Sequence, residues 1–88
     1  MPERDVEVVN PNGIHARPAA EIVKAAGRFK AHITLTREGM EVNAKSIMGV
    51  MMLAAERGST VRIAATGADA ASALEALAAI IGSNFGEH

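Results

Sequence analysis

Apolar and polar residues alternate along three stretches of the chain, and this period of two predicts β-strands. The stretches are residues 5–10 (DVEVVN), 31–36 (AHITLT) and 60–66 (TVRIAAT). A fourth, short strand is expected over residues 40–43 (MEVN), because the REGM segment that leads into it is typical of a hairpin turn. The residues that the alternation turns toward a core are Ile33, Leu35, Val61, Ile63 and Ala65.

Three other stretches show the apolar spacing of amphipathic helices. They begin near Ala16, at Ser46 and at Ala70, and Ser46 and Asp69 stand where N-cap residues belong. The expected ranges are residues 16–26, 46–55 and 70–81. The expected buried stripes are Ala19, Ile22, Val23 and Ala26 in the first helix, Ile47, Val50, Met51 and Ala54 in the second, and Leu74, Leu77, Ala78 and Ile81 in the third.

The resulting order is β-α-β-β-α-β-α, which favours an α+β layered domain with a mainly antiparallel sheet. Because the strands alternate, all three helices are expected to cover one face of the sheet and leave the other open. With 88 residues, the chain has room for one domain over residues 1–88. The polar residues expected to line the open face are Glu7, Thr34, Thr36 and Arg62.

Composition excludes several classes of function. The net charge is −1 and only two residues are aromatic, so nucleic acid is not an expected partner. Without cysteine there is no disulfide and no thiolate zinc site, and His15, His32 and His88 have no recognisable metal-ligand spacing, so no metal is expected. No apolar run approaches the ~20 residues of a membrane span. A soluble, cytoplasmic protein is expected.

The segment NGIHARPAA, residues 12–20, places His15, Arg17 and Pro18 at the start of the first expected helix. Pro18 is tolerated in a first turn, where its missing N–H has no helical partner. The free N–H groups of that turn attract anions, and Arg17 adds a fixed positive charge. His15 is thus a nucleophilic imidazole at an anion site, suited to accept a phosphoryl group. In the alternative interpretation, His15 is only an N-cap residue, Arg17 a solvated charge and Pro18 a helix starter.

Residues 13–19, GIHARPA, resemble the active-site motif of the HPr family, the histidine phosphocarriers of the bacterial phosphoenolpyruvate-dependent sugar phosphotransferase system. Residues 45–53, KSIMGVMML, are similar to the regulatory-serine segment of the same family. Ile14, where many members have Leu, is a conservative difference. The resemblance covers nearly the whole chain and implies an open-faced β-sandwich, in which three helices cover one face of a four-stranded antiparallel sheet.

The resemblance also implies a mechanism. Phosphoenolpyruvate phosphorylates Enzyme I, which passes the phosphoryl group to Nδ1 of the histidine that matches His15. His15 then passes it to a sugar-specific EIIA protein or domain, while Arg17 contacts the phosphoryl group. The protein would be a stoichiometric carrier rather than an enzyme, and it would need no cofactor. The residues expected to support the phosphate are Asn12, which would orient the ring, Ala16 and Pro18.

Some members of the family are phosphorylated at the serine that matches Ser46 by an HPr kinase/phosphorylase. A phosphate at a helix N-terminus is electrostatically favourable, so its effect would fall on docking rather than on the fold. Whether Ser46 is phosphorylated in this chain stays open at this point.

Four apolar residues of the second helix cannot all face inward, so we expect an exposed apolar surface beside His15. Enzyme I and EIIA would share this surface in weak, alternating contacts, and the carrier itself would be a monomer. The expected docking residues are Ala20, Lys24, Ile47, Met48, Met51 and Met52.

Two other functions fit the sequence. One is an HPr-like carrier of a regulatory, nitrogen-linked phosphorelay, which the residues do not separate from sugar transport. The other is a regulatory module that binds a transcriptional regulator through phosphorylated Ser46. Intact His15 and Arg17 argue against that as the sole role, because such members tend to lose the histidine.

Overall fold

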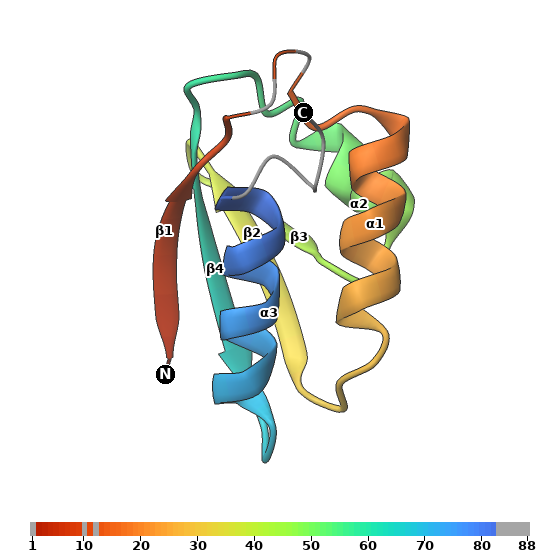
Figure 1. Ribbon diagram of the computed structural model, residues 1–88, viewed down its shortest axis with the longest axis vertical. Coiled ribbons are helices and arrows are strands. Elements are labelled where there is room, and N and C mark those ends of the chain that lie inside the picture. The colour runs from red at the N-terminus through yellow and green to blue at the C-terminus, as the bar shows by residue number, and fades with distance from the viewer. Residues whose placement is uncertain (1, 10, 12, 83–88) are drawn as a thin grey trace.

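The computed structural model of the chain describes residues 2–9, 11 and 13–82. In chain order the elements are β1 (Glu3–Glu7), α1 (Ala16–Ala26), β2 (His32–Arg37), β3 (Met40–Asn43), α2 (Ile47–Met52), β4 (Thr60–Thr66) and α3 (Ala70–Gly82). The strands form one four-stranded sheet in the order β1-β4-β2-β3, and each neighbouring pair is antiparallel (Figure 1). None of the helices in this part of the chain is long and apolar enough to cross a membrane.

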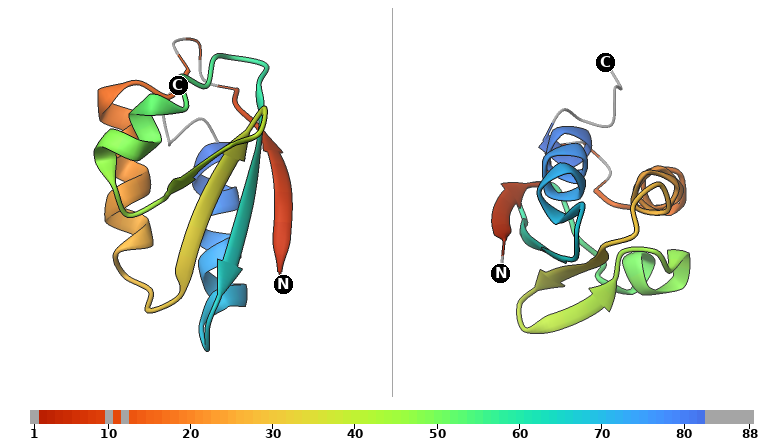
Figure 2. Two further views of the ribbon diagram at one scale, coloured as in Figure 1. Left: turned by 180° about the vertical axis from the view of Figure 1, so that it is seen from behind. Right: turned by 90° about the horizontal axis from the view of Figure 1, so that it is seen from below.

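All three helices lie on one side of the sheet, and the other side is open (Figure 2). The inward side chains of β2 and β4 face one another in register, with Leu35 opposite Ile63 and Ile33 opposite Ala65, and all four are buried. The predicted α+β fold with its open-faced sheet is therefore confirmed. The predicted polar residues do line the open face, where Glu7 stands opposite Thr60 on the same side as Thr34, Thr36 and Arg62.

The first strand lies further toward the N-terminus than the alternation predicted. It spans Glu3–Glu7 instead of residues 5–10, and position 10 lies outside the described residues. The polar residues before Val6 pair with the long β4, as an edge strand permits. Val8 leaves the ladder because its N–H donates to the Ser59 carbonyl (2.8 Å) and its carbonyl accepts from Gly58 N–H (2.8 Å).

The second helix is shorter than predicted, and most of its predicted stripe is wrong. It spans Ile47–Met52 rather than residues 46–55, and only Val50 of the stripe is buried. The helix ends because Ala54 adopts a left-handed conformation, with φ of +50°, which no continuing helix allows. Ile47, Met51 and Ala54 are exposed, whereas Leu53 and Ala55 enter the core.

The other two helices begin where the sequence predicted. In α1, the predicted residues Ala19, Ile22 and Ala26 are buried. Val23, also predicted to be buried, is only half-buried, and Ala25 is buried although it was not predicted to be. In α3, the predicted residues Leu74, Leu77, Ala78 and Ile81 are all buried.

Asp69 precedes α3 at the predicted position, but its carboxylate serves a distant segment. It accepts hydrogen bonds from the backbone N–H groups of Lys30 (2.9 Å) and Ala31 (2.8 Å), at the entrance to β2. These N–H groups, that of Lys30 first, lower the pKa of the Asp69 carboxyl, and the ammonium of Lys45 acts in the same direction. Asp69 thus fastens the loop before β2 to the start of α3.

We predict that Asp69→Asn lowers the melting temperature at pH 7, because the amide keeps one oxygen acceptor and replaces the other with a nitrogen that cannot accept the second hydrogen bond. The folded-state pKa of Asp69 lies below its ordinary value of 3.8. Its contribution to stability is therefore complete above that pH and is lost as the pH falls through the folded-state pKa. Thermal melts followed by circular dichroism should show a gap between the two proteins at pH 7 that closes toward pH 2.

Glu75→Gln is the matched control, because among the described residues the Glu75 carboxylate accepts only from the exposed Arg4 side chain (2.9 Å). It should melt close to the wild type at both pH values, as exposed ion pairs contribute little. A gap for Asp69→Asn that persists unchanged at pH 2 would contradict the assignment.

Candidate functional site

His15 occupies the N-cap position of α1. Its backbone is extended (φ −102°, ψ −162°), and its carbonyl accepts the first helical hydrogen bond, from Ala19 N–H at 2.9 Å. An N-cap side chain ordinarily accepts from the second or third helical N–H, but the third helical residue here is Pro18, which has none. The His15 side chain makes no capping hydrogen bond within the described chain, and it is exposed. The imidazole is therefore not used to cap the helix.

Two backbone N–H groups remain at the start of α1, those of Ala16 and Arg17. Neither has a helical carbonyl to bond to, and no other acceptor for them lies among the described residues. The Arg17 side chain is exposed, and the first turn contains no acidic residue. The beginning of α1 therefore combines two amide donors, the positive end of the helix dipole and one guanidinium beside an accessible imidazole.

The turn before His15 rests on the segment that follows α2. Ile14 is buried, and its N–H donates to the Ala55 carbonyl at 2.8 Å. Gly13 has a φ of +68°, and a Cβ at this position would overlap the Ala55 carbonyl oxygen. Only glycine therefore fits here. The backbone of Ala55 thus fixes the position of the turn that precedes His15. Asn12, expected to orient the ring, lies outside the described residues.

Ser46 is the N-cap of α2, as predicted. Its Oγ accepts from Gly49 N–H at 3.1 Å, and the residue is half-buried. The preceding residue fixes the approach to the helix, since Lys45 Nζ donates to the Phe29 carbonyl at 2.7 Å. Ser46 thus faces solvent in part while it holds the first turn of α2.

The exposed side of α2 carries four large apolar side chains, which we call the α2 patch: Ile47, Met48, Met51 and Met52. Met48 is 71% exposed and Met52 64%. The neighbouring α1 packs against α2 and exposes Ala16, Ala20 and Lys24, which recur at helical spacing from the first turn onward. The structure therefore places the predicted docking residues on two adjacent helices, of which α1 begins at His15.

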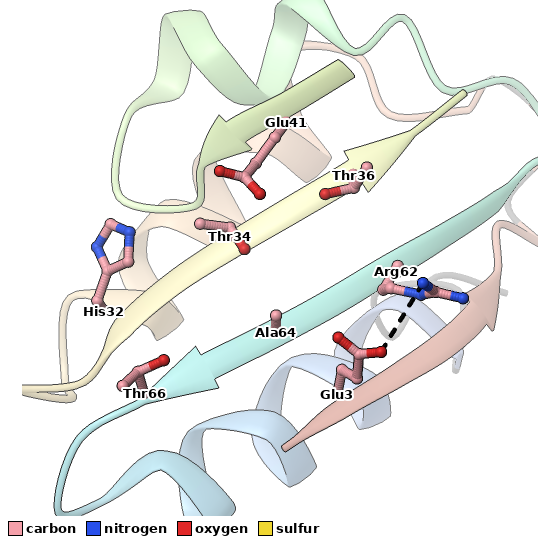
Figure 3. A pocket seen from close by; sticks show the side chains of 8 residues that line it. All are labelled: Glu3, His32, Thr34, Thr36, Glu41, Arg62, Ala64 and Thr66. Atoms are coloured by element: carbon pink, nitrogen blue, oxygen red, sulfur yellow. Dashed lines mark ion pairs between the residues drawn. The ribbon is translucent and has the colours of Figure 1, made fainter. Parts of the chain in front are cut away.

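His32 lies apart from this site. It lines a shallow depression of about 420 Å³ on the open face of the sheet, together with Glu41 and the threonines of β2 (Figure 3). In the same depression Arg62 forms an ion pair with Glu3 at 3.8 Å. No group of three side chains that could hold a metal ion occurs in the described part of the chain.

The sequence analysis missed the residues that support the His15 turn. The Ala55 carbonyl contacts Gly13 and Ile14 across about forty positions of sequence, and Ala55 was expected to lie at the end of a helix. The only local signal was Gly13, whose requirement for a close approach could be suspected from the sequence.

We predict that Gly13→Ala destabilises the protein by about 2–3 kcal/mol, because it adds a steric overlap to the cost of a left-handed backbone, itself about 1–2 kcal/mol. Gly58→Ala is the matched control. Gly58 also has a positive φ, +89°, but no described atom lies within 4 Å of the position that its Cβ would occupy. It should lose only the conformational cost, about 1–2 kcal/mol. Urea unfolding of both variants measures the difference, and equal losses would disprove the overlap.

Comparison with known proteins agrees with this geometry. The family model described as "PTS HPr component phosphorylation site" matches residues 2–83. The chain is 47% identical over 87 residues to the phosphocarrier protein HPr of Cupriavidus necator, covering 99% of this chain and 98% of that one.

Two solved structures extend the comparison. HPr from Thermoanaerobacter tengcongensis superposes with a TM-score of 0.96 at 43% identity, covering 100% of this chain and 99% of the other. Crh, a catabolite-repression protein of Bacillus subtilis described as a swapped-domain dimer, superposes with a TM-score of 0.78 at 44% identity over 99% and 100% of the two chains. By sequence, by fold and by the phosphorylation-site motif, the chain belongs to the HPr family of phosphocarriers of the phosphotransferase system.

Proposed function

We propose that the chain carries a phosphoryl group from phospho-Enzyme I to an EIIA protein or domain, with His15 as the phosphoacceptor. The observation that carries this proposal is the exposed His15 imidazole, which is not engaged in capping. Beside it lie Arg17 and two helix N–H groups that have no acceptor within the described chain. The family membership supports the general role, and these residues supply the specific site.

The proposed step is a nucleophilic displacement at phosphorus. A lone pair of the His15 imidazole forms the new P–N bond as the bond to Enzyme I breaks, and the reverse type of step delivers the group to EIIA. The amide N–H groups of Ala16 and Arg17, with the Arg17 guanidinium, donate to the phosphoryl oxygens, where negative charge is concentrated. Pro18 contributes no donor but fixes the first turn that aims the others. The protein is then a stoichiometric carrier.

The α2 patch is the proposed docking surface for both partners, together with Ala20 and Lys24. Large exposed methionines adapt to differently shaped surfaces, which suits a patch used by more than one protein. Because both partners need His15, they must bind in turn. We propose that the carrier acts as a cytoplasmic monomer, in contrast to the dimeric Crh structure, and sedimentation at working concentration tests this.

Regulation through Ser46 is the second candidate, favoured by its half-exposed N-cap position at the edge of the α2 patch. A phosphate on Oγ would gain from the positive end of α2 while it places a dianion next to Ile47 and Met48. It would weaken docking without unfolding the helix. An HPr kinase/phosphorylase would add it, and the phosphorylated form would bind a transcriptional regulator. The similar Crh is described as a catabolite-repression protein, which is consistent with a regulatory role. A nitrogen-linked phosphorelay would use the same His15 chemistry with a different EIIA.

We predict that incubation with phosphoenolpyruvate and Enzyme I produces an acid-labile phosphohistidine signal in the phosphorus NMR spectrum. The signal should be absent from His15→Ala and unchanged in His32→Ala, because His32 lies on the open face of the sheet. If the wild type shows no signal with an Enzyme I that phosphorylates another HPr, the proposed function is wrong.

We predict that Met48→Ser raises the KM of Enzyme I for the protein about tenfold, the equivalent of about 1.4 kcal/mol in binding. The melting temperature should change little, since Met48 is 71% exposed. Met40→Ser is the matched control, because Met40 is also exposed, at 45%, but lies on β3 outside the patch. Steady-state phosphotransfer measures both, and equal KM values for the two variants would place docking elsewhere.

A further inference from the structure

Arg37, the last residue of β2, directs its guanidinium toward the end of α2. Its Nη1 donates to the Leu53 carbonyl at 3.1 Å and to the Ala54 carbonyl at 3.4 Å. The side chain is only 22% exposed, and its ion pair with Glu38 is long, at 3.9 Å. The guanidinium is therefore engaged mainly with the backbone after α2. It also supplies a cation at the C-terminal end of that helix, whose own last turn contains no basic residue.

The backbone that Arg37 contacts is strained. Ala54 has a φ of +50°, a conformation that costs an alanine about 1–2 kcal/mol and a glycine far less. Helices commonly end with a glycine in this conformation just after the C-cap, and here Ala54 follows the C-cap residue Leu53. Ala54 therefore needs support from elsewhere in the fold, and Arg37 bonds to the carbonyls on both sides of the Ala54 Cα.

The strained residue lies one position before the support of the phosphorylation site. The Ala55 carbonyl accepts from Ile14 N–H at 2.8 Å, and Gly13 packs against the same oxygen. Ile14 directly precedes His15. The path from Arg37 to His15 thus passes through the Ala54 conformation and the Ile14–Ala55 hydrogen bond. The turn after α2 meets the start of α1 at one end of the molecule (Figure 1).

We propose that Arg37 is a positioning residue for phosphotransfer: by holding Ala54 in its left-handed conformation it fixes the Ala55 carbonyl on which the Ile14–His15 turn rests. The inference rests on the proposed role of His15 as phosphoacceptor. Arg37 need touch neither His15 nor a partner protein. It acts because a reacting group displaced by a fraction of an ångström transfers more slowly.

The test compares Arg37→Met, which keeps the length of the side chain and removes its donors, with the wild type. We expect kcat for transfer from Enzyme I to fall about three- to tenfold. The KM should stay unchanged, because the α2 patch is intact. Exchange of the Ile14 amide hydrogen should accelerate while that of Ile63, in the middle of the sheet, stays slow. Arg62→Met, on the open face, is the matched control and should leave all three readouts unchanged.

A second variant tests the route of the effect. Ala54→Gly removes the conformational cost that Arg37 offsets, so Arg37→Met/Ala54→Gly should recover kcat to within about twofold of the wild type. The proposal is overturned if Arg37→Met transfers at the wild-type kcat, if exchange of Ile14 and Ile63 accelerates equally, or if Ala54→Gly gives no recovery.

The two proposals fail in different ways. If the wild type accepts no phosphate from an active Enzyme I, the role of His15 is wrong. Amide exchange at Ile14 still reports whether Arg37 holds the turn, because that measurement needs no phosphotransfer.

Discussion

The apolar inner face of the sheet is the constraint from which the rest of the structure follows. Strands β2 and β4 present isoleucine, leucine and valine to one side only, and this surface is stabilised when water is removed from it. Three helices cover it, so each helix is oriented by its buried stripe and exposes its remaining surface. Covering the sheet thus brings α1 and α2 next to one another in this layer, and each of them exposes the side that does not face the core. The exposed residues of α1 and α2 therefore owe their arrangement to the way the two helices cover the core.

The ends of the elements are joined by specific backbone contacts rather than by packing. Asp69 binds the end of the loop before β2, Lys45 binds the middle of the same loop through the Phe29 carbonyl, and Ile14 binds the turn after α2. Each contact satisfies polar groups that would otherwise lack a partner at the end of an element. Together they hold the loops at fixed positions relative to the sheet. The start of α1 is held in the same way, through the Ile14 hydrogen bond.

The spacing of apolar residues predicted the sheet and the helices that cover it well. Burial of one face of a strand or helix makes apolar residues recur every two residues in a strand and every three to four in a helix. The inward residues of β2 and β4 and the stripe of α3 were all found from spacing. The stripe of α2 was not, because Ile47 and Met51 are apolar and yet exposed. Apolar spacing alone cannot tell a core residue from a docking residue. The exposed surface was expected because four apolar residues of one short helix cannot all face inward, and the family resemblance added the partners that would use it.

What the sequence could not supply was contact between distant segments. In the sequence, Asp69 looks like an N-cap and Arg37 like a surface charge at the end of a strand. Their actual partners cannot be identified there, because these are backbone N–H and carbonyl groups, which nearly every residue possesses. A backbone group leaves no mark in the sequence, so the support of His15 by Ala55 is visible only in three dimensions.

The third helical residue, Pro18, limits the site to two backbone donors, and this has an energetic consequence. A carrier must give up its phosphoryl group as readily as it accepts it. A site with more donors would stabilise the phosphorylated state and lower its group-transfer potential, so that the phosphate would remain on the carrier. On the proposed role of His15, the amide removed by the proline ring would leave the bound phosphoryl group closer in free energy to that on its donor and its acceptor. Fewer protein donors around the phosphoryl group would thus favour a reversible relay.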